Sequence, residues 1–190
     1  KRTAIVFGAT GLVGKMLVEE LIGSEQYSLV KTFVRKGSGD PVNIKTEEHI
    51  IDFGRLPDFY DLIRGDDLYI CLGTTIKKAG SVAAMERIDR DLPASIATAA
   101  VNNGVKRVAV VSSVGATPGS SNYYLRIKGE MEEKIRSAGF DHVAIVRPSM
   151  LLGERSEKRF GESAGKVLIN ILGFFLFGKY KKFRGIKAKD

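Results

Sequence analysis

A tyrosine and a lysine four residues apart have the clearest capacity for chemistry in this chain. Tyr124 and Lys128 lie in the segment 122–138, whose apolar spacing predicts a helix. The i,i+4 spacing puts the phenol and the ammonium on one face of that helix. The pKa of a free phenol is about 10, too high for acid–base work at neutral pH, and a nearby ammonium lowers it. We therefore expect Tyr124 to transfer a proton and Lys128 to tune it, although the same spacing also occurs by chance in plain surface pairs.

Two serines follow the predicted strand 108–111, upstream of this helix. One of their hydroxyls is expected to hydrogen-bond the oxygen of a substrate, and we assign that role to Ser113. Ser112 is assigned to the site of a bound cofactor. The alternative is that both hydroxyls only cap the loop that runs through Gly115.

A glycine-rich turn lies between the first predicted strand and the first predicted helix. Gly8 permits a tight turn, Gly11 lets the backbone approach a pyrophosphate, and Gly14 lets the helix pack closely on the strand. The helix N-terminus adds free N–H groups and a partial positive charge. The turn therefore predicts dinucleotide binding, and its spacing is GxxGxxG, one residue wider at the first gap than the usual fingerprint. The residues assigned to the cofactor here are Gly8, Thr10, Gly11, Leu12, Val13 and Gly14.

The end of the second predicted strand indicates which dinucleotide is bound. NAD enzymes place an acidic residue about 20 residues past the turn, on the ribose hydroxyl. Here Arg35 and Lys36 follow Val34 instead, and two cations suit a 2′-phosphate. We predict NADP(H), the alternative being that the two cations only solubilise a loop.

Further cofactor contacts are expected at the ends of the third and fourth strands. Asp52, with Phe53 beside it, is placed to meet the adenine amino group by resemblance to related folds. Leu72, Gly73, Thr74 and Thr75 close the fourth strand at the sheet edge where a ligand should lie. Either threonine could instead cap a turn.

These residues together predict hydride transfer between a nicotinamide and a carbonyl or alcohol carbon. Tyr124 gives or takes the proton and Ser113 orients the oxygen. Lys128 tunes Tyr124 and contacts the nicotinamide ribose.

The elements that must position these residues alternate between strand and helix. The strands are apolar nearly throughout, which predicts a parallel sheet covered on both faces. The fold class is therefore α/β: a doubly wound parallel sheet, or Rossmann fold, in three αβα layers, forming one domain over residues 1–190. Within it, residues 149–190 are expected to be a small substrate-side segment. The predicted strands are 3–7, 29–34, 49–51, 68–72, 108–111 and 143–146, and the predicted helices are 12–22, 56–63, 81–103 with a kink or break at Pro93, and 122–138.

Motifs spread along nearly the whole chain resemble one family. They are the GxxGxxG turn, Cys71–Thr75 with Lys78–Gly80, Asp89–Asp91, Ser112-Ser113 with Gly115-Ala116, Tyr124-Leu125 with Lys128–Glu130, and Arg147-Pro148 with Leu151-Leu152. In this order they are similar to the atypical short-chain dehydrogenases of the NAD(P)-binding Tat-interacting-protein oxidoreductase branch. The resemblance implies NADP(H), a Tyr–Lys–Ser centre, and Arg147 and Pro148 near the nicotinamide. Such proteins normally continue beyond this length, so we expect the C-terminus to be truncated.

A competing motif for hydrolysis is present at Gly161–Gly165, which matches G-x-S-x-G. The charged residues before it cannot form the buried strand that a nucleophile elbow needs, and no histidine follows Ser163 in the sequence. His49 and His142 abut short strands, where a structural role is expected. Neither of them has partners at metal-ligand spacing, nor does Cys71, so no metal is predicted.

Composition bounds the remaining possibilities. The chain is 44% hydrophobic and 27% charged, typical of a globular protein, and its one cysteine cannot form an internal disulfide. The longest apolar stretch, 167–177, is too short to span a bilayer. Residues 154–190 hold ten Lys/Arg against four Asp/Glu, which accounts for most of the net charge of +8. We interpret this region as a solvated tail, with nucleic acid or an anionic membrane as the less favoured partners, and predict a cytoplasmic protein.

The sequence is consistent with three hypotheses of function. The first is an NADP(H)-dependent reductase or dehydrogenase of a small carbonyl or alcohol. The second is a non-catalytic NADP(H) sensor or regulatory protein, and the third is an epimerase or dehydratase that uses the same centre. The intact Tyr124, Lys128 and Ser113 favour the enzyme, because a sensor would not need them. The sequence does not predict the substrate or the oligomeric state.

Overall fold

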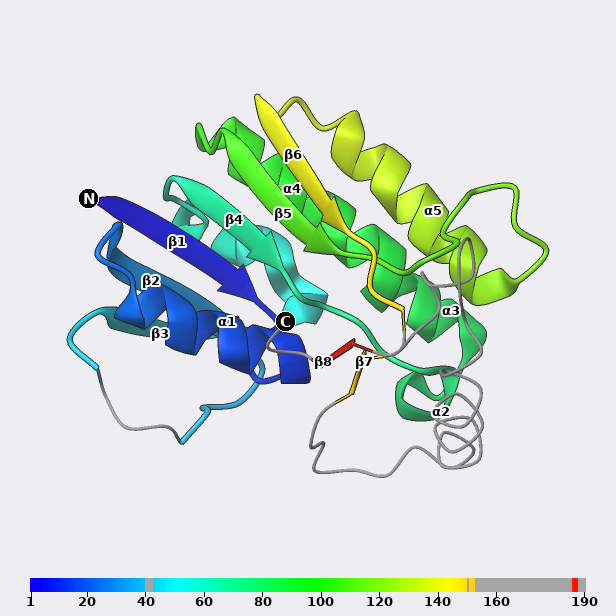
Figure 1. Ribbon diagram of the computed structural model, residues 1–190, viewed down its shortest axis with the longest axis horizontal. Coiled ribbons are helices and arrows are strands. Elements are labelled where there is room, and N and C mark those ends of the chain that lie inside the picture. Colours follow the sequence, from blue (N-terminus) through cyan, green and yellow to red (C-terminus); the bar gives the residue numbers. More distant parts are fainter. Residues whose placement is uncertain (40–42, 150, 153–185, 188–190) are drawn as a thin grey trace.

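Six parallel strands form the sheet that carries the site (Figure 1). The computed structural model describes residues 1–39, 43–149, 151–152 and 186–187. The strand order is β3-β2-β1-β4-β5-β6, and every neighbouring pair is parallel. The strands are β1 (Arg2–Phe7), β2 (Tyr27–Val34), β3 (Thr46–Ile50), β4 (Asp67–Ile70), β5 (Arg107–Val111) and β6 (His142–Val146), with a separate short pair β7 (Leu151–Leu152) and β8 (Ile186–Lys187).

Helices cover the two faces of this sheet. Those on one face pack into the larger core with β1, β2, β4 and β5, and α1 packs on the opposite face of β1 and β2. This arrangement confirms the predicted doubly wound α/β fold. The helices are α1 (Leu12–Gly23), η1 (Phe53–Leu62), α2 (Ile76–Ala79), α3 (Val82–Glu86), η2 (Arg87–Asp91), α4 (Leu92–Asn102) and α5 (Tyr123–Arg136).

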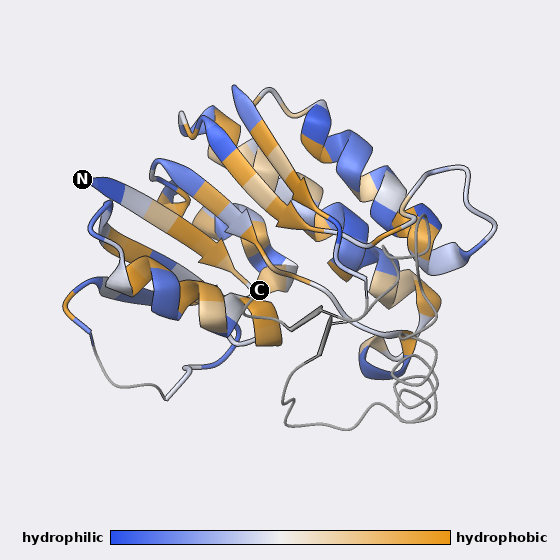
Figure 2. Cartoon of the chain, in the orientation of Figure 1, coloured by the Kyte–Doolittle hydropathy of each residue, from blue (hydrophilic) through white to orange (hydrophobic). Residues whose placement is uncertain are grey.

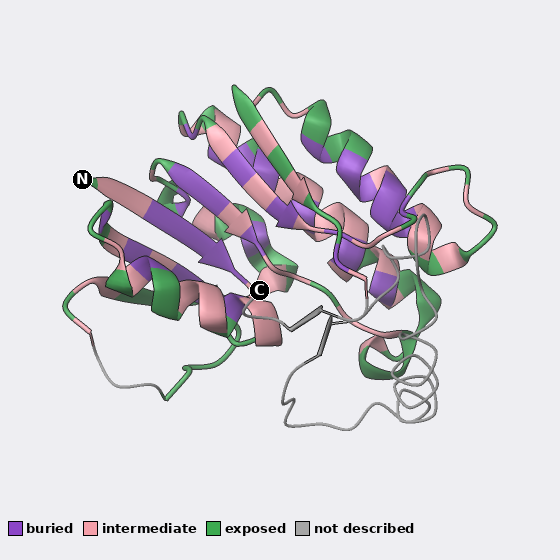
Figure 3. Ribbon diagram, in the orientation of Figure 1, coloured by how far each residue is buried: buried purple, intermediate pink, exposed green. Residues whose placement is uncertain are grey.

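The core explains why these strands occupy the centre of the sheet. Residues Ala4 to Phe7 of β1 have no exposed surface, because both faces of a central parallel strand are covered. The Phe7 ring stacks on Phe33 of β2, with 4.6 Å between ring centroids. Figure 2 shows the apolar residues gathered in the strands and on the inner sides of the helices, and Figure 3 shows that those of β1 and β4 are mostly buried, whereas those of β6 are partly exposed.

A buried carboxylate fixes the edge of the sheet where β4 and β5 begin. Asp67 is 4% exposed and accepts hydrogen bonds from the Tyr27 hydroxyl at 2.9 Å and from Arg107 Nε at 2.6 Å. Arg2 also pairs with this carboxylate. Burial and the hydrogen bonds with Tyr69 and Asp67 raise the pKa of Tyr27. This cluster lies at the opposite edge from the glycine turn and ties β1, β2, β4 and β5 together.

The predicted long helix is confirmed from Val82 to Asn102, and its regular geometry is interrupted as predicted, although the interruption does not lie at Pro93. The turn η2, between α3 and α4, is π-helical, so the irregular turn comes just before Pro93. Pro93 closely follows this turn, and proline lacks the N–H that a regular helical hydrogen bond needs.

Two other elements begin three residues earlier than expected. The third strand begins at Thr46, three residues earlier than predicted, because its charged residues lie on an exposed edge strand. The predicted helix 56–63 is a 3₁₀ segment that begins at Phe53, since Asp52 Oδ1 accepts a hydrogen bond from the Gly54 N–H at 2.8 Å.

Candidate functional site

The glycine turn forms a cradle in which backbone replaces side chain. Gly8 has φ +84°, a conformation that side chains disfavour, and a Cβ there would lie 2.6 Å from the Cys71 carbonyl oxygen. A Cβ at Gly14 would lie 2.1 Å from the Gly8 carbonyl oxygen, and one at Gly11 would lie 3.3 Å from the same atom. The Gly11 N–H donates to that oxygen at 3.0 Å. Any side chain at Gly8 or Gly14 would therefore break the turn.

The start of α1 has the features of an anion-binding helix N-terminus. Gly11 precedes the helix without a side-chain cap, and the first turn holds no acidic residue. The first intrahelical bond runs from the Lys15 N–H to the Gly11 carbonyl, so the N–H groups of Leu12, Val13 and Gly14 have no helical acceptor. Thr10 is exposed beside them. This cradle lies where the strand order reverses around β1, which is where such folds bind a pyrophosphate.

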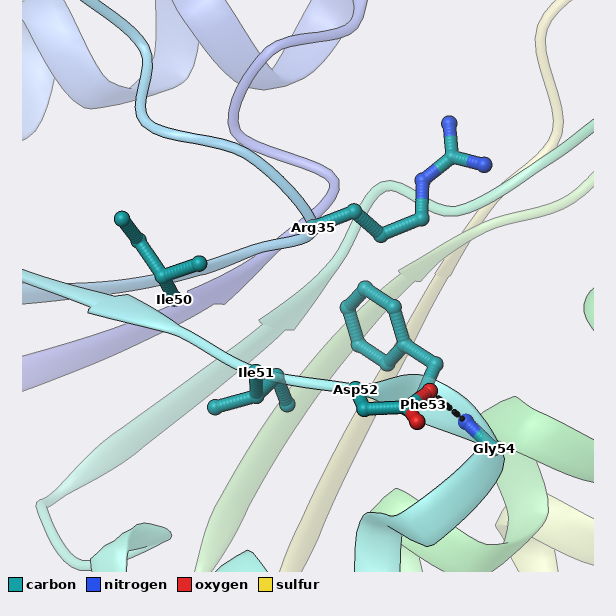
Figure 4. A pocket seen from close by; sticks show the side chains of 6 residues that line it. All are labelled: Arg35, Ile50, Ile51, Asp52, Phe53 and Gly54. Atoms are coloured by element: carbon teal, nitrogen blue, oxygen red, sulfur yellow. Dashed lines mark hydrogen bonds between the residues drawn. The ribbon is translucent and has the colours of Figure 1, made fainter.

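A pocket of about 540 Å³ opens beside the cradle, at the ends of β2 and β3. It is lined by Arg35, Ile50, Ile51, Asp52, Phe53 and Gly54. Arg35 and Phe53 project into the same space above the strand ends (Figure 4). Arg35 and Lys36 are both exposed, and Asp52 uses one carboxylate oxygen to cap η1. The structure therefore brings Arg35, Asp52 and Phe53 to one pocket. Lys36 follows Arg35 in the sequence but does not line the pocket.

The segment after β4 is held by side chains from two helices. The Thr74 N–H donates to Asp89 Oδ2 at 2.9 Å, and the Leu72 carbonyl accepts from Lys128 Nζ at 3.4 Å. The Thr75 hydroxyl accepts from the Lys78 N–H at 3.2 Å and so caps α2. Gly73, between Leu72 and Thr74, is exposed.

Tyr124 and Lys128 occupy successive turns of α5. Tyr124 is 38% exposed, whereas the Lys128 side chain is 3% exposed and its Nζ lies 2.9 Å from Asp89 Oδ1. The neighbouring Tyr123 differs: burial and the Glu86 carboxylate raise its pKa to about 12. Tyr124 is therefore the phenol of this turn that a small molecule can reach.

The two serines have different surroundings. Ser112 is buried, and its hydroxyl donates to Glu132 Oε1 of α5 at 2.5 Å. Ser113 is partly exposed, and its hydroxyl lies 3.5 Å from the Val114 carbonyl. Arg147 Nε donates to the same Glu132 oxygen at 2.8 Å. Ser112 and Arg147 thus lie on a buried carboxylate, and Ser113 holds the accessible hydroxyl.

The loop that carries Ser113 is packed directly on α5. A Cβ at Gly129 would lie 2.2 Å from the Thr117 carbonyl carbon, so this helix position must be glycine. The Val114 N–H donates to the Pro148 carbonyl at 3.0 Å, which joins the same loop to the end of β6. Gly129 and Pro148 therefore keep Ser113 at the edge where α5 presents Tyr124.

Sequence reasoning missed the roles of two buried acids. The sequence predicts Asp89 only as part of a family motif, and it predicts no role for Glu132. Both are charged residues in helices, which normally face water, and their partners are distant in sequence. The i,i+4 continuation from Lys128 to Glu132 was the one available signal.

A glycine cradle at the switch point of a parallel sheet defines a dinucleotide-binding domain. The comparisons agree: the NAD(P)H-binding family model matches residues 8–168, and the chain belongs to this family. The HTATIP2 protein of Rattus norvegicus is 34% identical over 164 residues, covering 85% of this chain and 67% of the rat protein. The FMP52 protein of Candida albicans is 34% identical over 174 residues, covering 88% of this chain and 76% of the relative. The predicted resemblance to the Tat-interacting-protein branch is confirmed.

Solved structures show the same fold. A short-chain dehydrogenase/reductase superfamily protein of Agrobacterium tumefaciens with bound NAD has a TM-score of 0.67 at 20% identity, covering 91% of this chain and 58% of its own. MoeE5 in complex with UDP-glucose and NAD has a TM-score of 0.64 at 20% identity, covering 80% of this chain and 55% of its own. The chain spans less than two thirds of these structures, and at such identity the likeness concerns the fold alone.

The predicted cytoplasmic location is wrong. The FMP52 relatives of Candida albicans, Candida glabrata and Saccharomyces cerevisiae are named as mitochondrial proteins. The prediction failed because one cysteine and short apolar runs do not distinguish the cytoplasm from an organelle.

Some expectations concern residues that the structure leaves undescribed. The G-x-S-x-G match at 161–165, the apolar stretch 167–177 and nearly all of the basic tail lie outside the described residues. Among the described residues, no helix is long and apolar enough to cross a membrane. In the same part of the chain, no three His, Cys, Asp or Glu side chains are grouped as metal ligands.

Proposed function

We propose that this protein is an NADP(H)-dependent oxidoreductase that interconverts a small carbonyl compound and its alcohol, with Tyr124, Lys128 and Ser113 as its reaction centre. Membership of the NAD(P)H-binding family supports an NAD(P) cofactor. The observation that carries the proposal is the exposed Tyr124 phenol one helical turn from the buried ammonium of Lys128. Both residues are on the helix that packs against the Ser113 loop.

Each residue has a distinct task in the reducing direction. When bound, NADPH supplies a hydride to the carbonyl carbon. Tyr124 gives its phenolic proton to the carbonyl oxygen, so that the C=O bond becomes a C–H and an O–H bond. Ser113 donates a hydrogen bond that orients this oxygen, and the Lys128 ammonium stabilises the phenolate left on Tyr124. The oxidation of an alcohol runs through the same groups in reverse.

The preference for NADP(H) rests on the pocket beside the cradle. Arg35 lines this pocket, where the adenine end of the dinucleotide would lie, and Lys36 follows it. No carboxylate takes the place of Arg35 at the end of β2, so a ribose 2′-phosphate meets a guanidinium there. We assign Asp52 and Phe53 to the adenine, and the loop from Leu72 to Thr75 to the remainder of the cofactor.

A screen of turnover tests this proposal. Oxidation of NADPH is followed with a panel of aldehydes, ketones and quinones, using wild type, Tyr124→Phe and Tyr123→Phe. We expect turnover with wild type and Tyr123→Phe, and a loss of at least about a hundredfold with Tyr124→Phe at unchanged NADPH affinity. Undiminished turnover in Tyr124→Phe would refute the mechanism. If wild type and both variants bind NADPH tightly but turn over no substrate of the panel, the result would support a regulatory role instead.

A further inference from the structure

A buried ion pair lies beneath the proposed reaction centre. Lys128 Nζ and Asp89 Oδ1 are 2.9 Å apart, and the two side chains are 3% and 0% exposed. Removing one partner of such a pair leaves an uncompensated charge in the interior, which is strongly unfavourable. Asp89 therefore supplies the compensating charge for the buried Lys128 ammonium.

The same carboxylate connects three parts of the chain. Asp89 Oδ2 accepts from the Thr74 N–H at 2.9 Å, in the loop after β4. The Lys128 ammonium also donates to the Leu72 carbonyl at 3.4 Å. A Cβ at the exposed Gly73 would lie 3.5 Å from Asp89 Oδ1 and 3.9 Å from Lys128 Nζ. The pair is thus buried directly under a residue without a side chain, at the sheet edge that faces the cofactor cradle.

The backbone around Asp89 departs from regular helix. The turn Arg87–Asp91 is π-helical between α3 and α4, and Asp89 is its buried acidic residue. Single π turns are rare and occur often at functional sites. Its neighbour Asp91 instead points to the surface, where it pairs with Arg90 at 2.8 Å and Lys134 at 3.7 Å.

We propose that Asp89 is a positioning residue of the reaction centre, which supplies the counter-charge of Lys128 and ties it to the loop after β4. This inference rests on the proposed function, because Asp89 acts only through Lys128. It touches neither the substrate nor the reacting atoms. Lys128 keeps a third N–H, free of Asp89 and Leu72, for the nicotinamide ribose.

The other charged groups around Lys128 cannot take over the role of Asp89. On α5, Glu132 is bound by Arg147, and Glu130 pairs with Arg90 of η2 at 2.9 Å. Tyr124, the proposed proton donor, lies one turn before Lys128 on α5. At the end of β4, burial raises the pKa of the Cys71 thiol to about 12, so this thiol stays neutral. Asp89 is therefore the counter-ion of Lys128 among the described residues.

The first test needs no cofactor. D89N leaves the buried ammonium without a counter-ion, so the folded chain gives up this proton at a lower pH than the unfolded chain. The unfolded state then binds more protons, and the stability of D89N rises with pH. We expect its deficit in Tm relative to wild type to shrink between about pH 6 and about pH 9. D91N, the matched control in the same turn, should show no such trend. A deficit of D89N that is the same at every pH would overturn the inference.

The second test measures turnover with a carbonyl substrate from the panel. We expect kcat of D89N to fall at least about tenfold near neutral pH and further as the pH rises, because Lys128 loses its proton. D91N should stay within about twofold of wild type. A kcat of D89N that equals wild type, or that falls by one factor at every pH, would overturn the inference. If Tyr124→Phe keeps full turnover, the proposed function fails first, whatever D89N does.

A double variant keeps the inference testable if D89N does not fold. K128M and K128M/D89N both lack the buried ammonium, so the role of Asp89 should vanish between them. We expect equal kcat and equal NADPH affinity for this pair, the signature of two residues that act as a unit. A further loss on adding D89N would show that Asp89 acts independently of Lys128 and would overturn the inference.

Discussion

Replacing Glu132 by glutamine tests how the ends of β5 and β6 are held. The Glu132 side chain is 4% exposed in the middle of α5. It accepts from the Ser112 hydroxyl at 2.5 Å and from Arg147 Nε at 2.8 Å, and its second oxygen pairs with Arg147 Nη2. One carboxylate thus fixes the strand end before Ser113 and the strand end before Pro148.

The structure sets the size of the expected effect. Breaking a buried ion pair costs about 3–5 kcal/mol, but Arg147 is 45% exposed, so water can solvate the freed guanidinium. Glutamine also keeps one acceptor oxygen for Ser112. We therefore expect Glu132→Gln to lose about 2–3 kcal/mol, less than a fully buried pair would cost. For a chain of this size the loss corresponds to a fall in Tm of about 4–12 °C.

The loss should also depend on pH. Burial raises the pKa of Glu132, but the hydrogen bonds from Arg147 and Ser112 outweigh burial, and the net pKa is lowered. A lowered pKa in the folded state contributes stability that is fully present above the unfolded value, about 4.3, and is lost as the pH falls through the folded value. The two proteins should therefore differ most near neutral pH and converge in acid.

Urea and thermal unfolding across this pH range provide the assay. Glu133→Gln is the matched control, since Glu133 is the next residue of α5 and is exposed. The control should stay within about 0.5 kcal/mol of wild type. Equal stability of Glu132→Gln and wild type near neutral pH, or a difference that grows in acid, would refute the reasoning.

Three further substitutions separate the site from its scaffold. Arg35→Asp should weaken NADPH binding at least about tenfold, because a charge-assisted hydrogen bond becomes a repulsion, and leave NADH binding within about threefold; equal losses in fluorescence titrations would contradict the NADP(H) assignment. Gly14→Ala should abolish measurable binding of either dinucleotide, because its Cβ would lie 2.1 Å from the Gly8 carbonyl oxygen; unchanged affinity by calorimetry would show that the cradle is not the site. Tyr27→Phe removes the hydroxyl that donates to Asp67 and should cost about 1–2 kcal/mol of unfolding free energy without changing NADPH affinity; a lost affinity would mean that the two edges of the sheet are coupled.

The sheet could be predicted because most of its strands are buried on both faces. Such strands are continuous apolar runs, as the segment from Ala4 to Phe7 shows, and glycines end the intervening helices. The strand Thr46–Ile50 was located less well, since three of its five residues are charged or histidine. An exposed edge strand has no apolar run to reveal where it begins.

The π turn could not be predicted from local sequence. Four of the five residues Arg87–Asp91 are charged, with both signs present, which is typical of an exposed helix. The turn instead buries Asp89 against Lys128, which is 39 positions away in the sequence. A contact between residues so far apart in the sequence leaves no signal in the local pattern.

Part of the candidate site could be predicted from the sequence, and part could not. Its glycines and the Tyr124–Lys128 pair have fixed spacings that express their chemistry, so they could be found in the sequence. The buried acids Asp89 and Glu132 have no such spacing, because each pairs with a base on another element. Motif spacing predicted the groups proposed to touch ligand, and the groups that hold those in place emerged only from the fold.

In the proposed reaction, hydride leaves NADPH for a carbonyl carbon while Tyr124 supplies the proton. Single-turnover reduction of a carbonyl compound from the panel, with NADPH deuterated at the transferable position of C4, tests it most directly. We expect mass spectrometry to find deuterium on the former carbonyl carbon with wild type, and at least about a hundredfold slower labelling with Tyr124→Phe saturated with the same cofactor. Oxidation of NADPH without label in the product, or equally fast labelling by Tyr124→Phe, would contradict the claim.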